Sequence, residues 1–268
     1  MPRLLILEGN TPDLALSAQK ELGRTAAQGF AESLKAEAPN LQCEVAAPYF
    51  DGFDPDAYDL AAYDGMVVTG SGVGWSAEDE RARPFWDMFE RAFAAGTPSF
   101  GSCWGMQTAA VTLGGEAKAG PNGVERGFAR SVRPVGDHPM MAGRREAFDV
   151  LCMHRDDVTR APEGAMVTAT NDHTAIQAFA YDQGGVSFWG VQYHPEIWLK
   201  EVAHWISRPG DAWSEAEAAK AKALLRVADD PAQNAFLAVK FGVNMDILDR
   251  PYHRTELRNW LRAKVCAD

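Results

Sequence analysis

Short apolar runs alternate with longer amphipathic stretches along the first 115 residues. The apolar runs, which predict buried strands, are LLILE near the start, LQCEVAA at 41–47, MVVTG at 66–70 and TPSFG at 97–101. The stretches with helical spacing between or after them cover 13–37, 78–95 and the residues from Cys103 to the Gly114–Gly115 pair. Alternation of strand and helix predicts an α/β fold, with a doubly wound, mostly parallel sheet flanked by helices.

The pattern changes between Val124 and Val191, where short β-rich runs are separated by turn residues. These runs are FARSVRPV, AFDVLCM, MVTATN, AIQAFAY and VSFWGVQY. Short runs spaced in this way are typical of antiparallel strands. We therefore expect antiparallel strands added to the parallel sheet.

Beyond residue 195 the pattern is helical. The segments are IWLKEVAHWI, then a break at SRPGD, then SEAEAAKAKALLRVADD, then a final part of two or three helices broken near Gly242 and Pro251. Ser214, followed three residues later by Glu217, predicts a capping box. We expect a main domain over 1–200 and a C-terminal helical extension over 201–268 packed on it.

Composition narrows the function classes. The chain has 268 residues, 46% of them apolar, and a formal charge of −11, which suits neither a phosphate backbone nor an anionic lipid surface. No apolar run approaches the roughly 20 residues that cross a bilayer, and MPRLLILEGN lacks the features of a secretory signal. The four cysteines are scattered, without metal-ligand spacing. We expect a cytoplasmic protein with no metal, cofactor, nucleic acid or membrane partner.

A cysteine between small residues, in GSCWGMQ at 101–107, stands where a strand is expected to turn into a helix. A nucleophile on such a sharp turn needs small neighbours, and Gly101 and Gly105 supply them. The N-terminus of the following helix favours the thiolate of Cys103 and directs the Trp104 amide toward a developing oxyanion. A cysteine nucleophile is thus one interpretation, and a buried structural thiol is the other.

A base for this cysteine occurs about ninety residues downstream, in GVQYHPE. The residue before a proline favours extended backbone, and residues two apart in extended backbone project to the same side. Glu196 can therefore orient His194 and favour its protonated form, while the other ring nitrogen faces the thiol. This is the pattern of a catalytic triad with cysteine as nucleophile.

Together, GSCWGMQ and GVQYHPE resemble the nucleophile elbow and the His-x-Glu signature of class I glutamine amidotransferases. The segments VVTGSG, LGG, GVERGF and MHRDDV occur in the family's order, so the resemblance covers roughly the first 200 residues. The chain looks similar to free-standing relatives of the amidotransferase domain of GMP synthetase. The resemblance implies a flavodoxin-like central sheet, in agreement with the strand and helix pattern.

The resemblance also implies roles for individual residues. Cys103 would attack the side-chain amide of glutamine to form a thioester, His194 would shuttle the proton, and Glu196 would orient His194. The expected oxyanion-hole donors are the backbone amides of Trp104 and Ser71, with Gly72 as the alternative to Ser71. The expected substrate contacts are Gln107, Gly127 and Phe128.

Two departures from the family pattern affect these assignments. Familiar members often read GGP or NGP where this chain has TGSGVGW, so the oxyanion loop has its own shape. Arg155 stands in MHRDDV where glycine is frequent. For this reason His154 and Asp156 are left outside the expected catalytic set.

Three functions follow. The first is a glutaminase-type amidotransferase that releases glutamate and hands ammonia to a partner synthase, because the chain shows no P-loop with which to activate an acceptor itself. The alternative is a self-sufficient hydrolase of γ-glutamyl peptides or other γ-glutamyl conjugates, since the same thioester chemistry cleaves any amide at that carbonyl. A non-catalytic regulatory module is the third, disfavoured by the intact triad.

Overall fold

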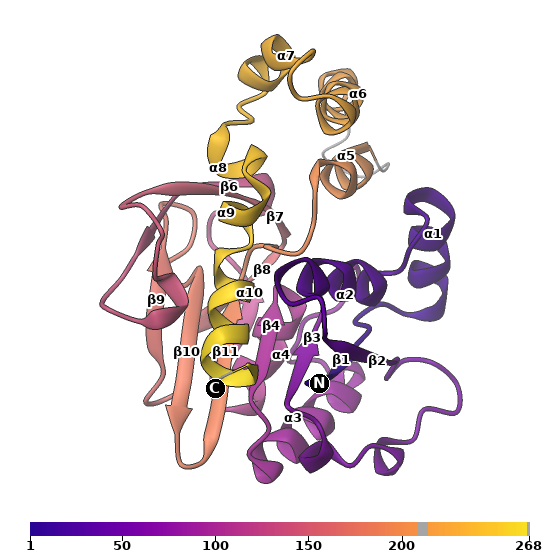
Figure 1. Ribbon diagram of the computed structural model, residues 1–268, viewed down its shortest axis with the longest axis vertical. Helices are drawn as coiled ribbons and strands as arrows, with labels where there is room; N and C mark the ends of the chain where they lie inside the picture. The colour runs from indigo at the N-terminus through magenta and orange to yellow at the C-terminus, as the bar shows by residue number, and fades with distance from the viewer. Residues whose placement is uncertain (208–213, 267–268) are drawn as a thin grey trace.

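The computed structural model describes residues 1–207 and 214–266 (Figure 1). Within these residues, nine strands form one sheet in the order β2-β1-β3-β4-β11-β10-β9-β6-β7. Its parallel part consists of β1 (Arg3–Leu7), β2 (Gln42–Ala46), β3 (Gly65–Val68), β4 (Ser99–Ser102) and β11 (Val186–Val191). The antiparallel part adds β6 (Glu125–Pro134), β7 (Phe148–His154), β9 (Met166–Thr170) and β10 (Ala178–Gln183). The predicted mixed sheet is confirmed.

The central strands are apolar because helices cover both faces of the parallel part. Helix α2 (Ala26–Glu37) covers one face, and α3 (Arg83–Ala95) and α4 (Trp104–Thr112) cover the other, whereas α1 (Pro12–Leu22) packs against the C-terminal helical part. Alternate residues of β1 join opposite cores. Ile6 packs in one core with Phe30 of α2, and Leu5 packs in the other with Phe89 of α3.

The prediction of one continuous helix over 13–37 is wrong, because the structure has two helices there. Gly23, with φ 78°, ends α1, and Thr25 begins α2 with a reciprocal capping box to Gln28. Glycine at a helix C-terminus and threonine at an N-terminus are common boundary residues. The chain therefore turns between two helices.

A second sheet was not predicted. It pairs β5 (Glu116–Ala119) antiparallel with β8 (Asp156–Arg160), which joins the residues after α4 to those after β7. The remaining short elements are 3-10 turns at Pro55–Ala57, Leu60–Ala62, Glu80–Ala82 and Pro139–Met141.

The C-terminal part is helical, as predicted. It comprises α5 (Leu199–Ser207), α6 (Glu215–Asp229), α7 (Ala235–Lys240), α8 (Met245–Leu248), α9 (Arg250–His253), α10 (Thr255–Trp260) and a π-helical turn at Leu261–Val265. In the predicted SRPGD break, residues 208–211 lie outside the described residues. Ser214 accepts a hydrogen bond from the Glu217 amide, which is one half of the predicted capping box, but between these two described residues the reciprocal bond from the Ser214 amide to the Glu217 side chain is not formed. Gly242, with φ 71°, follows α7, and the second predicted break falls at Asp249 between α8 and α9, just before Pro251 in the first turn of α9.

This helical part packs in two places. Helices α5 to α8 form a core of their own with Phe128 and Leu151, whereas α10 returns to the central sheet. Figure 1 shows α10 lying along the sheet face near β11, beside α2. There the buried Trp260 packs against Phe100 of β4, with ring centroids 5.8 Å apart. Helix α10 thus completes the hydrophobic core that α2 forms with the central sheet.

Candidate active site

Cys103 occupies the turn between β4 and α4 in a sparsely populated conformation with positive φ, with φ 50° and ψ −107°. A Cβ atom at Gly101 would lie 2.4 Å from the carbonyl carbon of Gly105, and one at Gly105 would lie 2.3 Å from the Val68 oxygen. Both distances are far below van der Waals contact, so only glycine fits at either position. The tight backbone presents Cys103 at the positive end of α4.

His194 and Glu196 lie just beyond the end of β11, and both are buried. The His194 Nδ1 and Glu196 Oε1 atoms are 2.7 Å apart, and the Ser102 hydroxyl donates to the same carboxylate oxygen at 3.0 Å. The backbone amide of His194 donates to Leu151 O at 2.8 Å. The imidazole is thus fixed by its backbone and by its carboxylate partner.

The charge on His194 depends on these neighbours. Burial by itself lowers the pKa of His194, but the charge of Glu196 and a hydrogen bond with Cys103 outweigh burial and raise this pKa to about 10. An imidazole held protonated beside a thiol favours the thiolate–imidazolium pair. In the thiol form, Cys103 Sγ lies 3.6 Å from the carbonyl oxygen of Met153, to which it donates.

A cavity of about 180 Å³ opens at Cys103. Its wall includes Trp104 and Gln107 of α4 and the segment from Met153 to Asp156. The Gln107 Nε2 group donates to the carbonyl oxygen of Asp156 at 2.6 Å, which joins α4 to this segment.

The segment that contains His154 and Asp156 is therefore part of the site's surroundings, although the sequence argument left both residues outside the catalytic set. Arg155 also borders the cavity, and its guanidinium donates to both carboxylate oxygens of Asp156, at 2.8 and 2.7 Å. In the sequence, this segment could have been recognised because MHRDDV occupies its expected place in the family's order of motifs. Arg155, which stands where glycine is frequent, was the reason for leaving the segment out.

Gly127 and Phe128 lie elsewhere. Among the described residues, those that border the Cys103 cavity do not include these two. Phe128 packs in the core of α5 to α8, and the Arg130 guanidinium lies 4.3 Å from its ring centroid. The structure brings Cys103 and Gln107 together in one cavity, but not Gly127 or Phe128.

Three backbone amides near the cysteine were candidates for the oxyanion hole, and they differ in whether they already have an acceptor. The Gly72 N–H donates to Asn10 Oδ1 at 2.9 Å, so it already has an acceptor. For the N–H groups of Ser71 and Trp104, no acceptor occurs in the described part of the chain. Both Ser71 and Trp104 border the Cys103 cavity.

A second, larger cavity of about 300 Å³ lies next to the imidazole, and its wall includes residues of α1, α2 and α5. His194 and Glu196 border this cavity, and Trp205 of α5 covers the imidazole, with ring centroids 5.1 Å apart. The two cavities share Ser71, Gly72 and Met153 in their walls.

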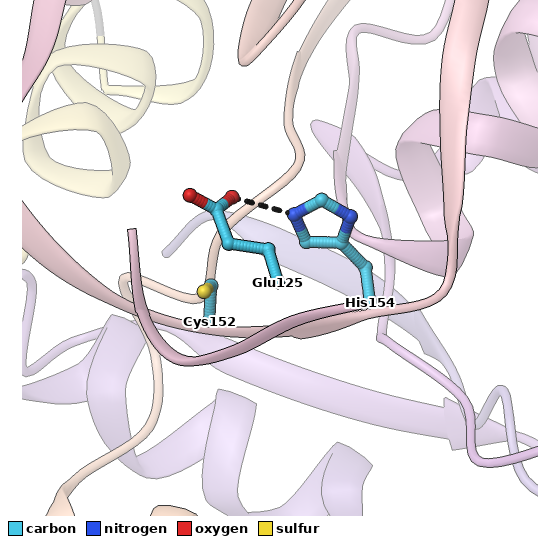
Figure 2. A group of neighbouring side chains, drawn as sticks. All are labelled: Glu125, Cys152 and His154. Carbon is cyan, nitrogen blue, oxygen red and sulfur yellow. Dashed lines mark hydrogen bonds and ion pairs between the residues drawn. The ribbon is translucent and has the colours of Figure 1, made fainter. Parts of the chain in front are cut away.

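One group of side chains has metal-ligand composition. Figure 2 shows Glu125 and His154 directed toward one another, with the sulfur of Cys152 beside them. The Nε2 atom of His154 forms a hydrogen bond of 2.8 Å with Glu125, whereas Nδ1 lies 3.0 Å from Asp157 Oδ1 as an ion pair without hydrogen-bond geometry. Burial opposes the charge on His154, but these two carboxylates raise its pKa to about 9.

The other two members of this group, Glu125 and Cys152, are also unsuited to bind a metal. The Glu125 carboxylate also accepts from Asn171 and Gln177, each at 2.7 Å, and burial raises the pKa of the Cys152 thiol. A metal needs an imidazole lone pair and ionised ligands. The arrangement is that of a buried ion pair that supports the wall of the Cys103 cavity.

Comparison with known proteins decides the family. The model for "Glutamine amidotransferase class-I" matches residues 26–208. The chain belongs to the class I glutamine amidotransferase family. Membership in this family makes it a hydrolase enzyme. Within the described ranges, no helix has the length and apolar character needed to span a bilayer.

Two kinds of curated relative resemble this amidotransferase. A γ-glutamyl-L-1-hydroxyisopropylamide hydrolase from a Pseudomonas species is 40% identical over 205 residues, which cover 73% of this chain and 68% of that protein. A glutamine-hydrolysing GMP synthase from Alcanivorax borkumensis is 33% identical over 167 residues. That match covers 59% of this chain but only 29% of the synthase, so the chain spans less than a third of it.

Solved structures share the fold. A glutamine amidotransferase from Thermotoga maritima superimposes with a TM-score of 0.64 and 20% identity, covering 97% of this chain and 96% of that one. A glutamine amidotransferase from Methylobacillus flagellatus gives a TM-score of 0.63 and 19% identity, covering 97% and 94%. Both matches include the C-terminal helices, so the flavodoxin-like sheet and the helical extension are shared with these amidotransferases.

Proposed function

We propose that Cys103, His194 and Glu196 form a catalytic triad that hydrolyses the amide at the γ-carbonyl of a glutamyl group. The observation that carries this proposal is the buried hydrogen bond of 2.7 Å between His194 and Glu196, with the His194 pKa raised by Glu196 and by Cys103. The positive φ of the elbow at Cys103 supports it, because strained nucleophile turns expose their side chain to substrate.

The reaction has two steps. The Cys103 thiolate attacks the γ-carbonyl carbon, a C–S bond forms, and the C–N bond breaks as His194 gives its proton to the departing nitrogen. Water then loses a proton to His194 and adds to the thioester, and the C–S bond breaks to release glutamate and return the thiolate. Glu196 holds the imidazole in the orientation that both transfers need.

The oxyanion of each tetrahedral intermediate would be held by the backbone amides of Trp104 and Ser71. We prefer Ser71 to Gly72 because the Gly72 amide already donates to Asn10. Each such donor contributes on the order of 3 kcal/mol to transition-state stabilisation. The α-amino and α-carboxylate groups of the substrate would lie in the Cys103 cavity, beside Gln107 and the opposite charges of Arg155 and Asp156, and not at Gly127 or Phe128.

Glutamine and larger γ-glutamyl amides are both candidates for the substrate. Similarity to the amidotransferase part of GMP synthases favours glutamine, with ammonia passed to a partner synthase. Similarity to the γ-glutamyl-L-1-hydroxyisopropylamide hydrolase, along 68% of its length, favours a self-sufficient γ-glutamyl amide hydrolase. The triad chemistry is the same for both.

The test is glutamate release by the purified protein from glutamine and from γ-glutamyl alkylamides. We expect Cys103→Ala to abolish release and Cys266→Ala, at an exposed cysteine, to retain it. A glutamine-like electrophile should label Cys103 in the wild type. Turnover that survives in folded Cys103→Ala, or labelling mainly at another cysteine, would contradict the proposal.

A further inference from the structure

The two cavities at the site border different members of the proposed triad. Cys103 borders the smaller cavity, whereas His194 and Glu196 border the larger one. Both cavities reach Ser71, Gly72 and Met153, so they meet at the elbow. A substrate that binds across this junction would place its acyl carbon at the sulfur and its leaving nitrogen at the imidazole.

We propose that the larger cavity is a binding site for the leaving amine, and that the preferred substrates are γ-glutamyl amides of an uncharged, predominantly apolar primary amine. This inference rests on the proposed triad and adds the substrate class. His194 must protonate the departing nitrogen, so the amine has to leave on the imidazole side. The cavity is on that side.

Its size supports an amine larger than ammonia. A volume of about 300 Å³ is at the lower end of typical ligand sites. At ~30 Å³ for each water-sized group, the cavity accommodates on the order of ten non-hydrogen atoms. Ammonia from glutamine would leave almost all of this volume unused.

The wall of the cavity indicates the chemistry of the amine. Helix α1 contributes Leu14, Ala18 and Leu22, and Ile197 and Trp205 lie across from them. Such surfaces stabilise a bound alkyl chain by about 0.8 kcal/mol for each methylene group removed from water, which corresponds to about a fourfold change in affinity.

Charges in the wall disfavour a second amino group. Glu201 is ion-paired with Arg24 and also accepts from the Trp198 amide at 3.0 Å, and Glu196 is engaged by His194. Arg126 adds a further positive charge to the wall, and its ion pair with Glu217 is long, at 3.8 Å. A cationic tail would therefore find both bordering carboxylates occupied and a cation nearby.

A matched substrate series tests the size and charge of the amine. Glutamate release should be measured for glutamine and for the γ-glutamyl methylamide, propylamide, pentylamide and 4-aminobutylamide. We expect kcat/KM to rise by roughly fourfold per methylene along the alkyl series. The pentylamide should exceed the 4-aminobutylamide, which has the same length but a charged end, by at least about tenfold.

Variants in the wall of the cavity test its location. Ala18→Phe should reduce kcat/KM for the pentylamide by about tenfold or more and leave glutamine within about twofold, because ammonia needs none of the filled volume. Ala36→Phe makes the same change at an exposed position of α2 and should behave as the wild type. Leu14→Ala enlarges the cavity and should shift the optimum to longer amides, a gain that misfolding does not produce.

The outcomes separate this inference from the proposed triad. If Cys103-dependent turnover is found with glutamine alone, or if Ala18→Phe affects glutamine and the pentylamide equally, the amine site is wrong and the triad stands. If the 4-aminobutylamide is preferred, the assigned amine class is wrong. If no substrate is turned over in a Cys103-dependent way, the proposed function itself fails.

Discussion

The His253 imidazole contacts the main-chain carbonyl of His194, with Nε2 3.1 Å from the oxygen. Burial and the charges of Arg144 and Arg250 lower the pKa of His253 to about 3, so the ring is neutral near pH 7 and Nε2 can donate. The neighbouring Tyr193 hydroxyl donates to Glu256 of α10 at 2.8 Å. The last helices of the chain thus hold the backbone that carries the proposed base.

Replacing His253 tests this link. His253→Leu leaves the His194 carbonyl without its donor, so we expect kcat to fall about tenfold while KM stays within about twofold. The loss of a buried hydrogen bond should also cost about 1–3 kcal/mol of stability. Steady-state kinetics and urea unfolding measure the two effects.

The control is His138→Leu, which removes a largely buried imidazole that packs against Trp189 of β11. It should lose stability but keep kcat. Equal effects of both substitutions on kcat would show that His253 acts only through general stability.

Much of the fold is readable in the sequence because the parallel strands are buried on both faces. Runs such as MVVTG are typical of buried strands, and the glycines of GSCWGMQ allow the tight turn that larger residues would prevent. The break at Gly23 and Thr25 could also have been predicted, because Thr25 and Gln28 have the spacing of a capping box. The helical spacing continues across the break, and for this reason one helix was predicted.

Other features depend on contacts between distant residues, which local patterns do not contain. The β5 strand, EAKA, is short and half polar, and it exists because it pairs with β8 about forty residues later. Apolar spacing in the C-terminal helices shows that they have a buried face, but not that α10 packs on the central sheet. The predicted boundary at 200 stays a prediction.

The same reasoning applies to the site. Cys103, His194 and Glu196 stand out because their local motifs set their geometry. The position of Arg155 and Asp156 beside the cysteine results from the pairing of β8 with β5, and only the folded chain shows it.

The charge of Glu196 is expected to control the base. Glu196→Gln keeps the shape of the side chain but removes the charge that raises the His194 pKa, so less thiolate–imidazolium pair forms. We expect kcat/KM to fall about a hundredfold or more, and its alkaline limb to move to lower pH. Ser102→Ala removes only the second hydrogen bond to this carboxylate and should cost about fivefold at most. A Glu196→Gln enzyme with wild-type pH dependence would contradict the role of the charge.

Gly70 is expected to be essential for a steric reason. A Cβ atom at Gly70 would lie 2.5 Å from His194 Cε1, so Gly70→Ala must displace the imidazole. We expect kcat to fall about a hundredfold, because an ångström of misplacement is enough to disrupt proton transfer. At Gly74 the same methyl group would meet no atom within 4 Å, and Gly74→Ala should keep wild-type turnover. Similar rates for the two variants would rule out the close packing of Gly70 on the base.

The ion pairs of His154 should make stability depend on pH. Its pKa is raised from 6.5 to about 9 in the folded protein, so the folded state binds more protons than the unfolded state between these values. The stabilisation is complete below pH 6.5 and is lost as pH rises through 9, by on the order of 3 kcal/mol. Glu125, whose pKa is lowered, contributes in the opposite direction and only at acidic pH.

The raised pKa of His194 makes stability depend on pH with the same sign as that of His154. The His154 contribution is therefore measured as the difference in stability between the wild type and a His154 variant at each pH. His154→Gln should be less stable than the wild type at pH 6.5, and the gap between the two should narrow as pH approaches 8.5. His173→Gln changes the neighbouring ring, 5.7 Å away, and should leave a constant gap across this range. Urea unfolding at each pH measures both gaps, and a pH-independent gap for His154→Gln would mean that the ring is neutral in the folded protein.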